Sequence, residues 1–488
     1  MSLGCGRSRR SSLFLRGLFF MVAVFLGLGY LFPVLDSVKD LKFVASSLSF
    51  CNDPAASTVK RRPSVKGSPT KNFRDNLLND TYYITGWASG GLTNAVMNFV
   101  RTLLRALPRV LTNVQANMIY LGKLTDRVPI VPPFAPAQHI SSTAGIIPFG
   151  DIFDLPVLRK ALEMDVLDWR EVKDIASRDD SDPYSPDEID ELGCWTTIKE
   201  SSRDPATGNN IIRHLGLDNS YTRLPPSVRL TTDMPAKDEP HVILPHLASV
   251  IFPVEPLIDA ESTTVLTPAP RSGHVRPPDH QLSCFDSLYY ASSGPKPFEW
   301  ERSWSPVWRT VGRHLRFTAA MEEIASAYMA RAFKLSTPTE KAPPFVAVHI
   351  RRGDFVGQCK SLPKTKTLEE DDCFPSLFAY EKHVEDTIED LWLVHDIYVP
   401  NVIVMSDETS PSFWSKVRER GWFFVNHTEA ATAERYGEWY LPLIDTVIQS
   451  HAVGFVGTKS STFSLLGERR VQDWNGGIVR EVSIRDSR

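Results

Sequence analysis

Short apolar runs alternate with helical patterns through the last third of the chain. The apolar runs are 345–350, 401–407, 422–425 and 452–457, and a polar residue follows each of them. The segments of helical periodicity that follow them are 381–394, 412–420, 434–451 and a last helix after 464. Short buried strands that alternate with helices form β-α-β units, so this part of the chain is predicted to be a doubly wound parallel sheet.

The first half of the chain has a weaker pattern within a proline-rich stretch. The predicted strands are 82–87, 128–133 and 241–244, and the predicted helices are 156–164, 187–192 and a long one from about 305 to 335. Residues 100–117 contain three arginines and Pro108 in the middle of a helical pattern, which proline should break. Joining Phe99 to Met118 gives a cleaner amphipathic helix. The sequence therefore predicts an inserted segment at 100–117, and a translated intron is one source for it.

The N-terminal part of the chain predicts a membrane anchor. Residues 17–35 form an uncharged run that is long enough for one membrane-spanning helix. Basic residues precede this run and Asp36 follows it, an asymmetry that places residues 1–16 in the cytosol. Residues 36–80, rich in polar residues and proline, are predicted to form a disordered stem. The alternative is a cleaved signal peptide with its cleavage site near Ser46.

Charge and cysteine content narrow the function. The net charge of -4 and the pI of about 6.3 give no basic excess for nucleic acid. If the anchor is correct, the rest of the chain is lumenal in the endoplasmic reticulum or Golgi, where Asn79 and Asn426 are glycosylation acceptors. Four cysteines, at 194, 284, 359 and 373, are available for pairing in that oxidising compartment. We expect a disulfide between Cys359 and Cys373, which would close a short loop.

Candidate chemistry follows the strand at 345–350. Arg351, Arg352, Gly353 and Asp354 come directly after it, and ligands of open α/β sheets bind beyond the carboxyl ends of strands. Guanidinium groups match phosphate oxygens, so the simplest ligand is a diphosphate. One alternative is that both arginines are structural, with one of them paired to Asp354. Another is that Arg352-Gly353-Asp354 is an integrin-binding tripeptide. Its position directly after a buried strand disfavours this, because such tripeptides act on exposed loops.

Three further motifs are less specific. A glycine loop containing Gly90, Gly91 and Asn94 follows the first strand and predicts a phosphate- or sugar-facing turn, or a plain tight turn. The hydroxyl-rich run at 458–464 suits phosphate, or it is a helix cap. Asp180-Ser181-Asp182 formally matches a metal-binding DxD motif, but no apolar strand precedes it, so a solvated turn is favoured and no metal site is predicted.

Together, these motifs resemble a known family. His349 to Phe355, Phe455 to Thr458, Ser460 to Ser464 and the loop at 90–94 are similar to motifs of the GDP-fucose protein O-fucosyltransferases and their fungal relatives. The resemblance implies a GT-B architecture, in which two Rossmann-like domains face each other across a cleft. Residues 81–335 would form the acceptor-side domain, and residues 336–488 the GDP-fucose-binding domain. It also implies an inverting reaction that needs neither a metal nor a cofactor.

The resemblance also implies roles for individual residues. Arg351 matches the arginine that grips the β-phosphate and steadies the leaving GDP, and Asn94 matches an asparagine that faces the acceptor. The other residues implied at the donor site are His349, Gly353, Asp354, Asp407, Asp445, Ser461, Thr462 and Phe463. Transfer of fucose to a protein hydroxyl is the implied reaction. Some members carry a glutamate as general base in the first glycine loop, and residues 88–93 here contain no carboxylate. A glycan acceptor and an inactive nucleotide-sugar-binding protein are therefore the alternatives.

Overall fold

The computed structural model describes a large part of the chain after residue 61. The described residues are 62–87, 115–136, 140–175, 188–197, 210–225, 228–230, 241–251, 266–286, 288, 291–295, 299, 302–337, 341–353, 374–483 and 486. The chain divides into two compact units, 1–62 and 63–488. Within the described residues, no helix is long and apolar enough to cross a membrane. The anchor predicted at 17–35 lies outside them, as do Gly90, Gly91, Asn94, Asp354, Cys359, Cys373 and the DxD match.

The predicted stem is too long at its C-terminal end. Residues from Pro63 onward belong to the second unit, which contains the short helix α3 (Phe73–Asn76). Phe73 and Leu77 are buried, and the ring of Phe73 meets that of Trp169 edge-on at 5.8 Å. The sequence of 63–80 looks polar on average, but these two side chains are enough to fix it on the folded unit.

A six-stranded parallel sheet is built from the first half of the chain. Its order is β3-β2-β1-β8-β4-β5. The strands are β1 (Tyr83–Gly86), β2 (Val128–Val131), β3 (Leu167–Asp168), β4 (Asp190–Thr196), β5 (Leu217–Arg223) and β8 (Leu282–Phe285). The predicted strands at 82–87 and 128–133 are confirmed. All four residues of β1 are buried because strands lie on both sides of it and helices cover the sheet.

Helices and a small sheet complete this half. The helices are α5 (Gln115–Leu124), α6 (Phe149–Ile152), α7 (Leu155–Leu162), α8 (Trp169–Val172), α9 (Asn210–His214) and α10 (Leu244–Ile251), with a 3-10 turn η1 (Ser142–Ala144). The small sheet contains β6 (Arg229–Leu230), β7 (His241–Ile243) and β9 (Ala291–Ser292). The strand predicted at 241–244 and the helix predicted at 156–164 are confirmed as β7 and α7.

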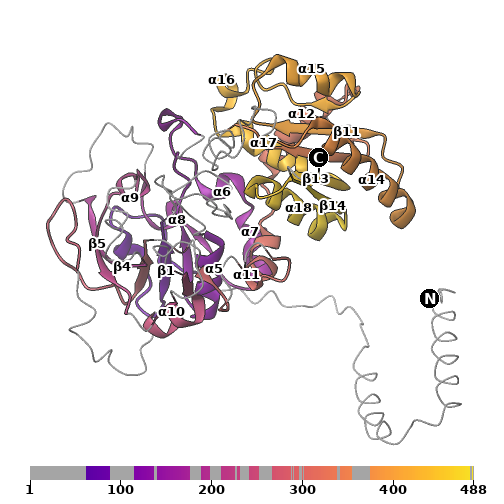
Figure 1. Cartoon of the computed structure of the whole chain (residues 1–488). Coiled ribbons are helices and arrows are strands. Elements are labelled where there is room, and N and C mark those ends of the chain that lie inside the picture. The colour runs from indigo at the N-terminus through magenta and orange to yellow at the C-terminus, as the bar shows by residue number, and fades with distance from the viewer. Residues whose placement is uncertain are drawn as a thin grey trace, which may run out of the picture. The chain divides into compact units, whose positions relative to one another are not determined.

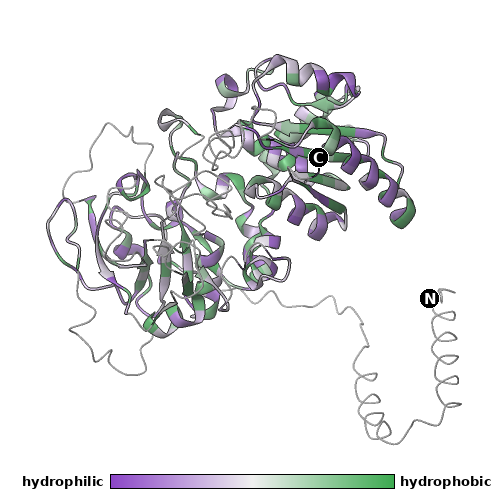
Figure 2. Ribbon diagram, viewed as in Figure 1, coloured by the Kyte–Doolittle hydropathy of each residue, from purple (hydrophilic) through white to green (hydrophobic). Residues whose placement is uncertain are grey.

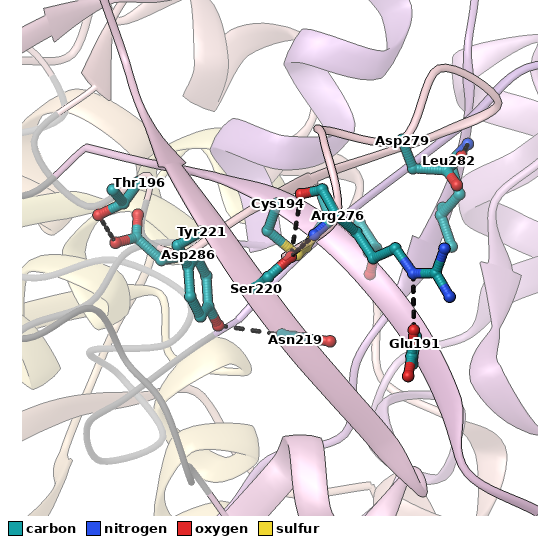
Figure 3. The surroundings of a disulfide bond; sticks show 12 residues. Glu191, Cys194, Thr196, Asn219, Ser220, Tyr221, Arg276, Asp279, Leu282 and Asp286 are labelled. Carbon is teal, nitrogen blue, oxygen red and sulfur yellow. Dashed lines mark hydrogen bonds and ion pairs between the residues drawn. A yellow bond between two sulfur atoms is a disulfide. The ribbon is translucent and has the colours of Figure 1, made fainter. Parts of the chain in front are cut away.

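The helix predicted at 187–192 is wrong, because this segment enters β4. A disulfide joins Cys194 of β4 to Cys284 of β8 (Figure 3). The next residues of the two strands, Trp195 and Phe285, are paired in the parallel register. Both cysteines are buried. This pairing differs from the one expected from the sequence. The Cys359–Cys373 disulfide stays a prediction, because both residues lie outside the described part of the chain.

A five-stranded parallel sheet is built from the last third of the chain, as predicted. Its order is β12-β11-β10-β13-β14. The strands are β10 (Phe345–Ile350), β11 (Asn401–Ser406), β12 (Phe423–Phe424), β13 (Gly454–Thr458) and β14 (Ile478–Val482). The helices are α14 (Leu377–His395), α15 (Pro411–Glu419), α16 (Thr432–Tyr436), α17 (Tyr440–Ser450) and α18 (Thr462–Asn475). Strand β14 was not predicted.

Strand β10 is central, and its side chains alternate between two apolar layers. Val346, Val348 and Ile350 pack in one cluster with side chains of α14 and α15. Phe345 and Ala347 pack in the other cluster, with side chains of α17. Helices therefore cover both faces of this sheet, and its strands are predominantly apolar (Figures 1 and 2).

Two predicted helices are broken in the structure. The segment 305–335 forms α11 (Pro306–Thr310), a 3-10 turn η5 (Gly312–His314) and α12 (Ala319–Ala332). The helix cannot continue, because Phe317 bridges to Phe153 and Thr318 caps α12 by accepting a hydrogen bond from the Met321 amide. The segment 434–451 is divided between α16 and α17, and Gly437, at φ +94°, ends α16.

The insertion predicted at 100–117 is too long at its C-terminal end. Helix α5 begins at Gln115, and Gln115, Ala116 and Asn117 are all buried in it. The side-chain Nε2 of Gln115 donates a hydrogen bond to the carbonyl of Pro132 at 3.0 Å. The side-chain Nδ2 of Asn117 donates a hydrogen bond to the carbonyl of Leu288 at 2.7 Å. These three residues are part of the core, and residues 100–114 lie outside the described part.

Deleting residues 100–117 is therefore expected to destabilise the protein, whereas deleting only 100–114 should be tolerated. The longer deletion leaves buried carbonyls without their donors, at a cost of about 1–3 kcal/mol each. Urea denaturation of the two deletion variants and the wild type measures the difference. Equal stability of both deletions would show that α5 does not depend on its first turn.

Candidate functional site

The carboxyl ends of three neighbouring strands bring the candidate residues together. β10 lies between β11 and β13, with His349 opposite Met405 on one side and Gly457 on the other. The residues that follow these positions, Arg351, Asp407 and Thr458, therefore meet at one edge of the sheet. This is the edge at which open α/β sheets bind ligands.

Arg351 is held by Asp407, the first residue after β11. Its Nη1 lies 2.7 Å from Oδ2 of Asp407, while Oδ1 accepts a hydrogen bond from the Arg352 amide at 2.8 Å. Gly353 lies so close to this carboxylate that a Cβ there would be 2.4 Å from Oδ2. A side chain at position 353 would therefore clash with this carboxylate unless Asp407 moved.

Arg352 has a structural environment. Its Nε forms an ion pair with Oε2 of Glu408 at 2.7 Å. Its guanidinium stacks over the ring of Phe374 at 4.5 Å and lies 5.4 Å from that of Phe413. The structural alternative thus fits Arg352, with Glu408 as its partner in the described part of the chain.

His349 is buried beneath the arginine and is neutral. Burial lowers its pKa to about 3, an effect to which the charge of Arg351 adds and which that of Asp407 opposes. Its Nδ1 is 2.8 Å from Oγ of Ser464, and its ring centroid is 4.7 Å from that of Phe463. A histidine with this pKa does not exchange protons near neutral pH, so it can orient neighbours but cannot act as a titrating acid or base.

The hydroxyl-rich turn leads into α18. Ser461 is its N-cap, and its Oγ accepts a hydrogen bond from the Ser464 amide at 3.4 Å. Ser461 and Thr462 are largely buried, and Ser460 adopts a left-handed conformation at φ +68°. The positive end of a helix dipole thus lies at the same strand edge as Arg351, an arrangement that favours an anion.

The sequence from residue 83 to residue 472 matches the family model described as GDP-fucose protein O-fucosyltransferase. The chain belongs to this family. It is therefore a member of a family of GDP-fucose-dependent fucosyltransferase enzymes, as the motifs at 349–355 and 455–464 predicted.

Solved structures with a similar arrangement are those of POFUT1 and NodZ. POFUT1 in complex with GDP gives a TM-score of 0.48 at 17% identity, covering 82% of this chain and 98% of that chain. POFUT1 in complex with GDP-fucose gives 0.47 at 16% identity, covering 83% and 98%. The fucosyltransferase NodZ from Bradyrhizobium gives 0.37 at 10% identity, covering 80% and 93%. No curated protein sequence matches the chain. The family assignment therefore rests on the sequence match.

Asp445 of the fucosyltransferase is bonded elsewhere. Its Oδ1 lies 3.0 Å from Nε2 of His427, whose Nδ1 lies 3.0 Å from Oγ1 of Thr432. The hydroxyl of Tyr328 is 2.8 Å from the same Thr432 atom. This chain of hydrogen bonds ties α17 to α16 and α12, which gives Asp445 a structural role in holding these helices together.

The two predicted glycosylation acceptors, Asn79 and Asn426, are both exposed, as a glycan requires. Their modification stays a prediction.

Within the described residues, no group of histidine, cysteine, aspartate and glutamate side chains could hold a metal ion.

Sequence reasoning named Thr458 and Ser464 only as members of the hydroxyl-rich run at 458–464, without a contact to Arg351, and it missed Tyr380. The Arg351 amide donates to Oγ1 of Thr458 at 2.8 Å, and the Thr458 amide donates to Oγ of Ser464 at 2.9 Å. Thr458 had a usable signal, since it ends the strand that pairs with β10 in a doubly wound sheet. Tyr380 had none, because it lies within a helix whose pattern shows only that the residue is apolar and buried.

Glu468 is a buried carboxyl group next to this network, in α18. Its Oε1 would lie 2.8 Å from a Cβ built at Gly457, and the side chain is almost entirely buried. Burial raises its pKa from 4.5 to about 8, and Glu481 adds to this effect, while Arg469 and Lys459 oppose it. The folded fucosyltransferase thus keeps a proton on Glu468 that the unfolded chain releases above pH 4.5.

Glu468 is therefore expected to make the protein less stable as the pH rises. Between pH 4.5 and about 8 the folded state binds one more proton at this site than the unfolded state, so the free energy of unfolding falls as the pH rises through this range. The contribution of the Glu468 carboxyl to stability is fully present below pH 4.5 and is lost by about pH 8. Glu468→Gln should reduce the loss of unfolding free energy between pH 5.5 and pH 8.5, as measured by urea denaturation. Glu419→Gln, on the exposed side of α15, is the matched control. The same slope in both variants would contradict this prediction.

Proposed function

We propose that this fucosyltransferase moves fucose from GDP-fucose to a hydroxyl group of a protein acceptor, with inversion and without a metal ion. The observation that carries the proposal is Arg351, which is held at the carboxyl end of β10 beside the N-terminus of α18. The GT-B arrangement, with a cleft between two Rossmann-like domains, belongs to the same proposal.

The chemistry explains why a fixed arginine matters. When the acceptor oxygen attacks C1 of fucose, the bond from C1 to the β-phosphate oxygen breaks, and its electron pair stays on GDP. The acceptor hydroxyl gives up its proton to water or to the leaving diphosphate, so the products are the fucosylated acceptor, GDP and one proton. Negative charge therefore develops on the diphosphate, and a guanidinium aimed at it by Asp407 stabilises that charge without reorganisation. The N-terminus of α18 adds partial positive charge at the same edge.

Gly353 and Asp407 serve the same purpose in this proposal. Oδ2 of Asp407 is ion-paired with one nitrogen of the Arg351 guanidinium, and the absence of a Cβ at Gly353 leaves the space that this carboxylate occupies. Ser461, Thr462 and Phe463 would contact the nucleotide, with Phe463 resting on the neutral ring of His349. Asp354 and the acceptor-side residues Gly90, Gly91 and Asn94 keep the roles implied by the family.

We place the protein in the lumen of the endoplasmic reticulum or Golgi, as a single-pass type II membrane protein. The uncharged run at 17–35, the exposed acceptors Asn79 and Asn426, and the Cys194–Cys284 disulfide support this location. Deleting residues 1–40 should yield a soluble, folded protein that can be secreted when a signal peptide is supplied. Full-length protein that is found with a new N-terminus near Ser46 would instead show a cleaved signal peptide.

A GDP-release assay tests the proposed function. Purified protein is incubated with GDP-fucose alone, with an unfolded or folded polypeptide acceptor pool, and with a pool of free glycans, and the products are analysed by mass spectrometry. Polypeptide carrying fucose on a serine or threonine supports the proposal. Fucose on glycans alone would contradict the protein acceptor. Binding of GDP-fucose with no GDP release under any condition would show an inactive binding protein, the alternative that the lack of a carboxylate at 88–93 favours.

A further inference from the structure

We infer that Thr458 and Tyr380 are positioning residues that fix the backbone of Arg351, and that they act on GDP-fucose only through it. This inference rests on the proposed role of Arg351 in donor binding. Neither residue needs to contact the donor, because each acts on the peptide units from which the arginine side chain extends.

The hydroxyl of Thr458 is saturated with hydrogen bonds, and their directions can be assigned. The Arg351 amide lies 2.8 Å from Oγ1 and can only donate, while the carbonyl of His349 lies 3.0 Å away and can only accept. The single proton of Thr458 therefore points to His349. The Tyr380 hydroxyl, 2.7 Å from the same oxygen, must then be a donor. One threonine oxygen thus makes three bonds, two of them to the backbone on either side of Ile350.

The strand end is held from the opposite side as well. Oγ of Ser406 donates to the carbonyl of Ile350 at 2.6 Å, and Oδ1 of Asp407 accepts from the Arg352 amide at 2.8 Å. Side chains from β11 and from the end of β13 thus replace the ladder bonds that stop where β10 ends. Such backbone groups must find partners when buried, and here the partners also fix the direction in which Arg351 leaves the sheet.

Thr458 also connects Arg351 to α18. Its amide donates to Oγ of Ser464 at 2.9 Å, in the first turn of the helix that Ser461 caps. The same residue thus sets the spacing between the guanidinium and the helix N-terminus, the two positive groups at this edge. A diphosphate that contacts both would be sensitive to this spacing, because a small misplacement of a positioning group weakens all of its contacts.

Tyr380 supports the arrangement from α14. Its side chain is fully buried, and burial raises its pKa, so the hydroxyl keeps its proton at working pH. Because it must donate to Thr458, a tyrosine here holds the threonine rotamer in which Oγ1 faces both backbone groups. Phenylalanine would fill the same space without this bond.

The test is a set of paired substitutions, measured by calorimetry with GDP-fucose on the whole chain. Thr458→Val removes the hydroxyl at nearly constant volume and is expected to weaken donor binding by about tenfold or more. Thr458→Ser keeps the hydroxyl and should bind within about threefold of the wild type. Tyr380→Phe should fall between them. Thr387→Val, which removes a buried hydroxyl bonded within α14 to the carbonyl of His383, is the matched control and should leave donor affinity unchanged.

A double-mutant cycle separates positioning from general destabilisation. In an Arg351→Ala background, Thr458→Val should cause no further loss of affinity, since the residue through which it acts is gone. Equal losses in both backgrounds, or equal affinities of Thr458→Val and the wild type, would overturn the inference. If Arg351→Ala alone leaves GDP-fucose binding unchanged, the proposed donor site itself is wrong. If Arg351→Ala weakens binding but Thr458→Val does not, only the positioning role of Thr458 is wrong.

Discussion

Arg351→Ala is expected to lower the rate of fucose transfer by about two orders of magnitude, which corresponds to about 3 kcal/mol of transition-state stabilisation. The side chain is ion-paired at the edge of the sheet and is not part of the apolar core, so the fold should remain intact. Asp407 keeps one partner in the variant, the Arg352 amide. The loss should therefore appear in catalysis and not in the melting temperature.

The companion variants separate charge from geometry. Arg351→Lys should restore little activity, because an ammonium group cannot contact Asp407 and a phosphate with the planar fork of arginine. Arg418→Ala removes an exposed arginine of α15 and should behave as the wild type. Arg352→Ala should lower stability more than donor binding, since it loses Glu408 and the stacking on Phe374. Wild-type kinetics for Arg351→Ala would show that the donor phosphates bind elsewhere.

The double variant Cys194→Ala/Cys284→Ala is expected to lose about 4–5 kcal/mol of unfolding free energy. The disulfide spans a sequence separation of 90 residues, and in the chain-entropy model a loop of that length restricts the unfolded state by this amount. Both sulfur atoms lie in the core between β4 and β8, so alanine also leaves a small cavity. Chemical denaturation of the wild type with and without reductant, and of the double variant, measures the loss.

The second cysteine pair provides a comparison. Cys359→Ala/Cys373→Ala would remove the disulfide predicted from the sequence, which closes a much shorter loop, and should cost about 3 kcal/mol. Reductant should lower the free energy of unfolding of the wild type. A double variant whose cysteines form a disulfide in the wild type should show the loss in the absence of reductant as well. Unchanged stability of Cys194→Ala/Cys284→Ala would mean that this bond does not form in the protein as it is produced.

The last third of the chain could be predicted because its apolar runs are short and its helices are regular. Strands β10, β11 and β13 lie inside the sheet and are almost entirely buried, so their sequences are nearly continuous in apolar residues and are bounded by turns. The edge at Arg351, Asp407 and Thr458 follows from that topology alone. Strand β14 was missed because it lies at the edge of the sheet and carries Arg480 and Glu481, which a buried strand would not.

Elsewhere, tertiary contacts decided what local pattern could not. Asp190 to Leu192 has helical propensity, but strand pairing with β5 and the disulfide at Cys194 fix it as β4. The long helix expected after Ser305 is interrupted because Phe317 finds a partner in Phe153, far away in the sequence. Asp445 matched an acidic position of the family's donor site by sequence, yet its carboxylate is hydrogen-bonded to His427. No spacing rule anticipates these three contacts.

A crystal structure of the protein with GDP tests the central claim most directly. The account predicts the β-phosphate within hydrogen-bonding distance of the Arg351 guanidinium, with backbone amides at the N-terminus of α18 contacting the same diphosphate. Asp407 should remain paired with the arginine. A diphosphate bound at any other strand edge, with Arg351 still held by Asp407 and out of its reach, would contradict the assignment of the donor site.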